Sequence, residues 1–203
     1  MKRSLSLTAA SLLIVGILLP ARPAAAAADP AAVITSLGNE ALKVLGRNVD
    51  PNVRVARFRE LFSDDFDVPG IARFVLGRYW RLATPDQQQE FIRLFTNYIA
   101  FVYSNELAEY SGETLRVTGT RAAPDGQLVS SEIMRTNGQP PAPVDWLLVP
   151  VDGAYKIRDV IVESVSMAVT QRSEFASVIQ RNGGQVQGLI IALRQKTESA
   201  GLR

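Results

Sequence analysis

The stretch TPDQQQEFIRLFTNYIAFVY, residues 84–103, predicts a helix that is buried on every side. Thr84 and Gln87 have the spacing of a capping box, and Pro85 occupies the first helical position, where a missing N–H is tolerated. One apolar face then follows at helical spacing, formed by Phe91, Leu94, Phe95, Tyr98 and Val102. From Tyr98 to Tyr103 the apolar residues cover the whole circumference, and such a helix needs packing partners all round. We expect it to run to about Glu109.

Three shorter helices are predicted before it. Ala32–Leu45 carries one apolar stripe, Asp50-Pro51 is typical of a helix start, and a third helix follows Asp67. The residues expected to face inward are Val55, Phe58, Leu61 and Phe62 in the second helix and Ile71, Phe74 and Val75 in the third. Gly77 is expected to end the third helix with a positive φ. The pair Tyr79-Trp80 that follows is open to two interpretations, a binding site or the packing of a helix joint.

The second half of the chain changes its apolar spacing after Ser111-Gly112. The shorter spacing predicts four strands: Thr114–Thr118, Leu128–Arg135, Val144–Val151 and Tyr155–Val162. Asp152-Gly153 predicts a tight hairpin between the last two. Two helices follow, near Met167–Arg181 and Val186–Lys196, and Ser166 is expected to cap the first. The predicted fold class is α+β, with an antiparallel sheet of about four strands and helices before and after it.

The N-terminus has the pattern of a secretory signal peptide. Lys2 and Arg3 precede an apolar run, Leu5–Leu19, and the alanine run Ala24–Ala28 offers a cleavage site before Asp29. The apolar run has about 15 residues, fewer than the ~20 that a membrane-spanning helix needs. We therefore expect residues 1–28 to be removed and residues 29–203 to form a single exported domain in the periplasm.

Composition excludes most catalytic chemistry. The chain has no cysteine and no histidine, which removes thiol and Ser-His nucleophiles and the usual transition-metal ligands. It also has no phosphate-binding loop and no dinucleotide-binding motif. Lys2, Arg3 and Arg22 leave with the signal peptide, so the 22 basic residues fall to 19 against 20 acidic ones. The sequence therefore predicts no cofactor, no metal and no nucleic-acid partner.

Two aspartates keep an enzymatic hypothesis open. Asp145 and Asp159 lie within apolar strands, where a carboxylate with a raised pKa can act as a general base. A small isomerase-like enzyme acting on a hydrophobic substrate would use one of them, with Tyr155 as the one further acid-base candidate. The alternative is that both are hydrogen-bonded structural residues. A third hypothesis is an accessory protein with an ordinary filled core.

Four motifs resemble the MlaC family, also called toluene-tolerance proteins. They are FDVPGIARFVLGRYWR (66–81), residues 88–103, YKIRDVIVESVSM (155–167) and SEFASVIQRNGGQVQGLIIAL (173–193). Two positions depart from the family pattern: Tyr155 stands where tryptophan is common, and Ser164 where glycine is common. The second departure leaves open the backbone conformation before the Met167 helix. A branch of the family associated with hopanoid synthesis is also compatible with these motifs.

The resemblance implies a periplasmic phospholipid carrier that works between the inner and outer membranes. The implied fold is a curved sheet and helices around an apolar cavity that holds acyl chains. The implied partners are a phospholipid, an inner-membrane ABC transporter complex with its lipid-binding periplasmic subunit, and an outer-membrane lipoprotein complex, with the carrier itself a monomer. Combined with the apolar pattern, it gives these candidate cavity residues: Val75, Tyr79, Phe91, Phe95, Tyr98, Ile99, Val102, Tyr103, Trp146, Leu148, Ile157, Val160 and Met167. Arg78 and Arg81 are candidates for head-group binding or docking, although each is also compatible with a solvated surface residue.

Overall fold

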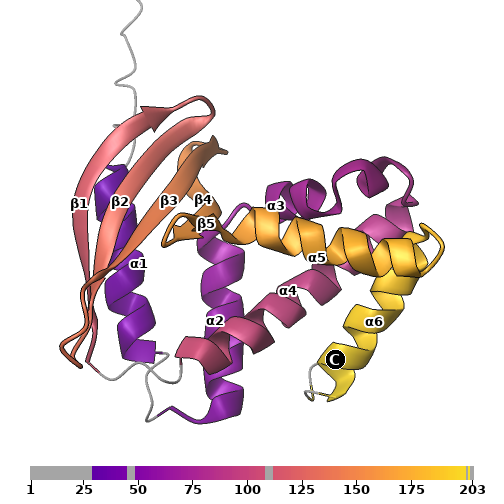
Figure 1. The fold of residues 1–203 in the computed structure, drawn as a ribbon, viewed down its shortest axis with the longest axis horizontal. Coiled ribbons are helices and arrows are strands. Elements are labelled where there is room, and N and C mark those ends of the chain that lie inside the picture. The colour runs from indigo at the N-terminus through magenta and orange to yellow at the C-terminus, as the bar shows by residue number, and fades with distance from the viewer. Residues whose placement is uncertain (1–28, 45–48, 108–111, 200, 202–203) are drawn as a thin grey trace, which may run out of the picture.

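The computed structural model describes residues 29–44, 49–107, 112–199 and 201 (Figure 1). Residues 1–28, with the predicted signal peptide, and the predicted helix end at Glu109 lie outside this part. In chain order the elements are α1 (Pro30–Val44), α2 (Pro51–Asp65), α3 (Val68–Leu76), the 3-10 helix η1 (Gly77–Arg81), α4 (Pro85–Leu107), β1 (Thr114–Ala123), β2 (Gly126–Met134), β3 (Ala142–Val151), β4 (Ala154–Val162), β5 (Val165–Ser166), α5 (Met167–Arg181) and α6 (Val186–Ser199). The α+β prediction is confirmed, with a fifth strand that the sequence did not indicate.

The helices begin where the capping residues predict. Thr84 Oγ1 accepts from the Gln87 N–H at 3.2 Å, and Gln87 Oε1 accepts from the Thr84 N–H at 3.1 Å, which completes the capping box of α4. Asp50 caps α2, Asp67 caps α3 and Ser166 caps α5, each by accepting backbone N–H bonds. Each cap satisfies N–H groups that the first turn of a helix leaves without intrahelical partners.

The five strands form one antiparallel sheet in chain order, β1-β2-β3-β4-β5. The pairing of β3 with β4 shifts between Leu147 and Leu148, so that Leu147 pairs with Asp159 and Leu148 with Ile157. Arg158 is therefore an extra residue, a β-bulge, and bulges bend a strand and increase its twist. The bulge lies in the middle of β4, and it separates two differently covered ends of the sheet.

The β4–β5 turn answers the question that Ser164 raised. Its two residues, Glu163 and Ser164, have φ of 49° and 71°. Positive φ at both central residues is the geometry of a type I′ hairpin turn, which favours glycine or asparagine. The turn therefore adopts the conformation that glycine favours although it carries Ser164, at a cost of order 1 kcal/mol for each strained residue. An ion pair from Arg135 to Glu163, at 3.1 Å, tethers the turn to the end of β2.

Two apolar cores hold the molecule together (Figure 1). In the first, α3, α4, α5 and α6 pack with one another on the side of the molecule away from the sheet. In the second, α1 and α2 cover the inner face of the sheet. Helix α4 packs against both α2 and α6, and none of its residues from Tyr98 to Tyr103 is exposed. This confirms the prediction of partners on two sides.

One inward prediction in α3 is wrong. Phe74 is 39% exposed, and its ring lies under the Arg172 guanidinium of α5 at 5.1 Å. A cation over an aromatic face is a favourable arrangement at a surface. Gly77, which ends the helix beside it, has the expected positive φ of 54°, and a Cβ there would lie 3.0 Å from the same arginine.

Candidate functional site

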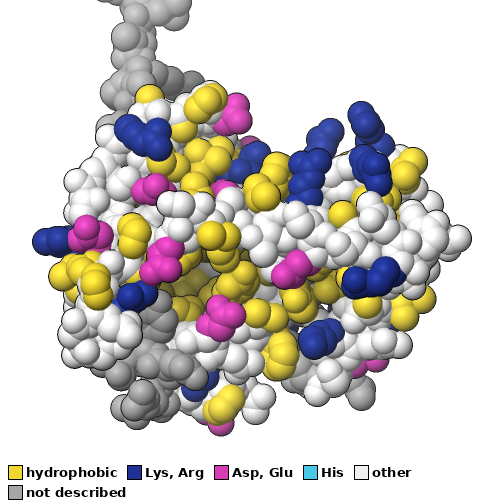
Figure 2. Space-filling view, in the orientation of Figure 1, with side chains coloured by type: hydrophobic (Ala, Val, Ile, Leu, Met, Phe, Trp, Pro, Cys, Tyr) yellow, Lys and Arg dark blue, Asp and Glu magenta, His cyan; other side chains and the backbone are white. Residues whose placement is uncertain are grey.

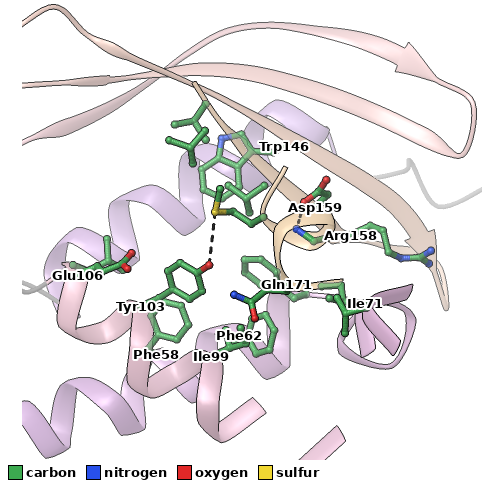
Figure 3. Close-up of a pocket in the computed structure, with 18 of the residues that line it drawn as sticks. Phe58, Phe62, Ile71, Ile99, Tyr103, Glu106, Trp146, Arg158, Asp159 and Gln171 are labelled. Atoms are coloured by element: carbon green, nitrogen blue, oxygen red, sulfur yellow. Dashed lines mark hydrogen bonds between the residues drawn. The ribbon is translucent and has the colours of Figure 1, made fainter. Parts of the chain in front are cut away.

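A pocket of about 400 Å³ lies between the two cores (Figure 3). This volume is within the ~300–1,000 Å³ range of small-molecule sites. Its walls come from α2, α3, α4, β2, β3, β4 and α5, so that residues from most of the chain meet around it. They are Phe58, Phe62, Phe66, Ile71, Val75, Phe95, Ile99, Tyr103, Glu106, Leu107, Ile133, Val144, Trp146, Arg158, Asp159, Val160, Val162, Met167, Ala168 and Gln171.

The helix side of the pocket is mainly aromatic. Phe58 and Tyr103 stack at 6.5 Å between ring centroids, and Phe62 contacts Phe66 at 4.9 Å. Phe58 and Phe62 stand on α2, Phe66 directly follows that helix, and Tyr103 stands on α4. A wall of packed rings offers a large apolar surface with few rotatable bonds. Figure 2 shows apolar side chains around a hollow in this face of the molecule, with acidic side chains near its edge.

The sheet side of the pocket is one end of a single face. Val144, Trp146, Val160 and Val162 line the pocket. Beyond the bulge, Leu148 and Ile157 point to the same face but are fully buried. They pack there with Ile34 and Leu37 of α1 and Leu61 of α2. The same face is thus filled at one end, which we call the filled end, and hollow at the other, the hollow end.

Two charged residues in the pocket wall are already paired. Asp159 accepts hydrogen bonds from Ser166 Oγ at 2.5 Å and from the Ala168 N–H at 3.0 Å, so each of its oxygens holds the start of α5. Arg158 forms an ion pair with Asp67, the cap of α3, and Figure 3 shows its guanidinium extending away from the pocket. Asp145, the other candidate base, does not line this pocket. The geometry therefore assigns Asp159 a structural contact.

Tyr103 and Gln171 present polar atoms to the pocket that are poorly satisfied. The Tyr103 hydroxyl donates to Met167 Sδ at 3.7 Å, and a thioether is a weak acceptor. Burial raises the pKa of Tyr103, Glu106 adds to the rise, and the neighbouring Gln171 amide opposes it. Gln171 is 8% exposed, and no described residue donates a hydrogen bond to its Oε1. An unpaired buried acceptor of this kind costs roughly 1–3 kcal/mol.

Seven of the predicted cavity residues line this pocket: Val75, Phe95, Ile99, Tyr103, Trp146, Val160 and Met167. Six do not. Tyr79 and Phe91 are buried in the helical core, and Tyr98 packs on Phe175 of α5 at 6.0 Å. Leu148 and Ile157 belong to the filled end, and Val102 is partly buried elsewhere on α4. In each case the side chain is apolar and covered, but it faces another part of the protein.

The pair Tyr79-Trp80 is a packed helix joint in this structure. Tyr79 is 6% exposed and Trp80 packs against the same helical core. The Arg78 guanidinium lies over the Tyr79 ring at 4.9 Å and donates to its hydroxyl at 2.8 Å, which lowers the pKa of Tyr79. Arg78 and Arg81 are both exposed and do not line the pocket. The structure thus separates them from the apolar site.

More than half of the residues that line the pocket were not among the candidates from the sequence. Phe58, Phe62 and Ile71 were expected to face inward, but nothing in their spacing distinguished a pocket from a core. Gln171 lies on α5 within the polar run Thr170–Glu174, and it carries no motif. Nothing in that run distinguishes the buried amide from its exposed neighbours Arg172 and Ser173.

The fold and the pocket define a class: an α+β protein in which helices and one open antiparallel sheet enclose an apolar ligand pocket. The model of the family described as MlaC protein matches residues 35–195. The chain belongs to the MlaC protein family.

Individual relatives agree with this assignment. Toluene tolerance protein ttg2D of Pseudomonas putida is 30% identical over 172 residues, covering 81% of this chain and 80% of the relative. The intermembrane phospholipid transport system binding protein MlaC of Haemophilus influenzae is 22% identical over 125 residues, covering 60% of this chain and 58% of that protein. The phospholipid-binding protein from Ralstonia solanacearum, solved in complex with a phospholipid, has a similar fold, with a TM-score of 0.70 at 24% identity over 85% of this chain and 98% of that one.

Proposed function

We propose that this protein is a phospholipid carrier that holds acyl chains in the pocket and exchanges lipid with membrane-bound complexes. The observation that carries the proposal is the hollow end of the sheet, where aromatic and aliphatic walls meet around space that the protein's own side chains leave empty. The names of the relatives, which include a phospholipid transport system binding protein, support the same conclusion. The carrier needs no catalytic group of its own.

The energetics explain why such a pocket is needed. Moving a phospholipid with roughly 30 chain methylenes into water costs on the order of 24 kcal/mol at ~0.8 kcal/mol per methylene. A carrier offsets this cost by offering equivalent apolar surface in a dry space. If the pocket matches the membrane interior, transfer to either membrane is nearly balanced. Direction then comes from partner affinity or from ATP hydrolysed by another protein.

We place this carrier in the periplasm, between the inner and outer membranes. The support is the predicted signal peptide, residues 1–28, which would direct the chain out of the cytoplasm. In the part of the chain that the structure describes, no helix has the length and apolar character required to cross a bilayer. N-terminal sequencing of the protein recovered from the periplasm tests this, with Asp29 expected as the first residue.

We further propose that Arg78 and Arg81 serve docking instead of head-group binding, because they stand apart from the pocket. Two other arginines and three apolar side chains of α3, α5 and the end of η1 are also exposed, and we call the whole set the arginine surface: Arg73, Phe74, Arg78, Arg81, Leu82, Val169 and Arg172. Figure 2 shows Lys and Arg side chains standing out over the α3 region. Such a surface fits an acidic face on a membrane-bound partner, and the attraction should weaken with salt.

The docking test uses the double substitution of Arg78 and Arg81 by glutamate. We expect unchanged folding and lipid content but slower lipid transfer to membranes that contain the partner complex. Arg121→Glu, an exposed substitution on β1, is the control and should transfer lipid at the wild-type rate. Normal transfer by the double variant would remove the docking role. Loss of bound lipid in that variant would instead favour head-group binding.

The test of the carrier function is to purify the exported domain, extract it with organic solvent and identify the extract by mass spectrometry. We expect a near-stoichiometric phospholipid. An empty protein that takes up no added lipid would contradict the proposal. Recovery of a hopanoid in place of phospholipid would assign the chain to the hopanoid-associated branch. The identity of the extracted lipid would also report the number of acyl chains that the pocket holds.

A further inference from the structure

The pocket contains two polar groups that an ordinary acyl chain would leave unused. The hydroxyl of Tyr103, on α4, and the amide of Gln171, on α5, both face the pocket (Figure 3). The tyrosine proton is directed at a sulfur atom 3.7 Å away, and the glutamine oxygen accepts no hydrogen bond from any described residue. A pocket that only had to hold hydrocarbon would be better lined by phenylalanine and methionine at these two positions.

The other polar groups of the wall differ from this pair. Asp159 is fully engaged by Ser166 and Ala168. Arg158 has a buried Nε without an acceptor, but the rest of its guanidinium pairs with Asp67 and its side chain is 37% exposed. Gln171 is more than nine-tenths buried and lies among apolar side chains. The Gln171 amide already shares a side-chain hydrogen bond with Tyr103, which lowers the pKa of that tyrosine. The pair is left with a phenol O–H on a weak acceptor and with Gln171 Oε1 lacking a donor.

We propose that Tyr103 and Gln171 form a subsite for an aliphatic hydroxyl group on the lipid. The Tyr103 O–H would turn from the Met167 sulfur and donate to the ligand oxygen, while the ligand O–H would donate to Gln171 Oε1. A hydroxyl can make both bonds because it is at once a donor and an acceptor. The ester oxygens of a diacyl phospholipid only accept, so they would leave Gln171 Oε1 unpaired. The inference rests on the proposed carrier function and specifies which lipids the same pocket prefers.

Such a hydroxyl has two sources in membrane lipids. It is either a substituent on the acyl chain or the free glycerol hydroxyl of a single-chain phospholipid. Both hydroxyls would make the same two hydrogen bonds. The two lipids would differ in how deep the rest of the molecule lies in the pocket. Matched probe pairs distinguish them: hydroxystearic acid with the hydroxyl in mid-chain against stearic acid, and lysophosphatidylethanolamine against its analogue without the glycerol hydroxyl.

The experiment measures binding of all four probes to delipidated wild-type protein, Gln171→Met and Tyr103→Phe. We expect the wild type to prefer the hydroxylated member of at least one pair by roughly fivefold to tenfold, the value of one or two net hydrogen bonds. Both variants should lose that preference, so that each binds the two members of a pair with equal affinity. Gln89→Met, which removes an exposed amide on α4, is the control and should keep the wild-type preference. The pair that shows the preference identifies the source.

A stability measurement separates a ligand subsite from a structural contact. Because Gln171 Oε1 is unpaired, Gln171→Met should leave the empty protein as stable as the wild type or more stable in urea. Marked destabilisation would show that the amide holds the fold, and would overturn the proposal. An equal preference for the hydroxylated probes in the wild type and both variants would also overturn the proposed subsite. If stearic acid still binds in that case, the carrier function stands. Failure of all four probes to bind would contradict the carrier function itself.

Discussion

The filled end and the hollow end of the sheet are built from the same kinds of residue and serve different purposes. At the filled end, Leu148 and Ile157 are fully buried under α1 and α2. At the hollow end, Trp146 and Val160 belong to the same face of the same strands but border the pocket. The difference lies in what stands opposite each end. Strand sequence determines which face is apolar, whereas the placement of the helices determines whether that face is packed or left for a ligand.

The largest expected effect is the difference in stability between the two ends. Ile157→Ala should reduce the free energy of unfolding of the empty protein by about 2–5 kcal/mol, because it opens a cavity in a packed core. Val160→Ala at the hollow end should cost less than about 1 kcal/mol, since its side chain already borders empty space. Urea denaturation of the delipidated proteins measures both. Equal losses would mean that the hollow end is packed in solution.

A larger side chain should reduce stability in the packed core but reduce lipid content in the pocket. Val129→Phe, in the buried cluster that contains Leu148 and Ile157, should destabilise by about 1–3 kcal/mol, because its side chain is fully buried and well packed. Val162→Phe should fold normally but carry much less lipid, since the new ring occupies pocket space. Thermal unfolding and lipid extraction on the same preparations give the two readouts. A Val162→Phe protein with full lipid content would show that this wall does not meet the ligand.

A smaller effect concerns the strained turn beside the hollow end. Ser164→Gly should stabilise the protein by about 1 kcal/mol, because glycine adopts the positive φ of 71° without strain. Ser173→Gly inside α5 is a suitable control and should destabilise slightly through its poorer helix propensity. Chemical denaturation compares the two. No gain from Ser164→Gly would indicate that the turn is not strained in solution.

The smallest expected effect is a titration difference between two tyrosines. Burial raises the pKa of Tyr103 above its ordinary value of 10.0, whereas the Arg78 hydrogen bond lowers that of Tyr79. Because Tyr103 stays protonated longer in the folded state, its contribution is complete below pH 10.0 and is lost as pH rises through the higher folded-state pKa. Ultraviolet titration of wild type, Tyr103→Phe and Tyr79→Phe assigns the two steps. Lipid loading should move the Tyr103 step further upward and leave the Tyr79 step in place.

Most of the fold could be predicted because its signals are local. The capping residues Asp50, Asp67, Thr84 and Ser166 each mark a helix start that the structure confirms. The strand β1 extends beyond the predicted Thr118 to Ala123, because an exposed edge strand lacks the apolar alternation that the prediction relied on. The strand β5 was missed because two residues are too few to show a period.

The pocket could be predicted only in part, because the apolar periodicity of a helix or strand identifies its buried face. It does not show whether another element fills the space opposite that face. Tyr98 and Ile99 are adjacent on the same buried helix, yet only Ile99 lines the pocket. Leu148 and Trp146 point to the same face of β3, but only Trp146 lines the pocket. The deciding factors are the bulge at Arg158 and the crossing of α2, which depend on contacts between segments far apart in sequence.

The walls of the pocket come from segments that span residues 58–171, so a ligand in it would contact seven of the twelve elements of the described domain. A ligand that binds only the native state shifts unfolding by mass action. Loaded and empty molecules therefore differ in how often they open, and a protease that cuts opened chains will digest the empty ones first. Proteolysis would thus remove empty molecules first and leave the lipid-loaded ones.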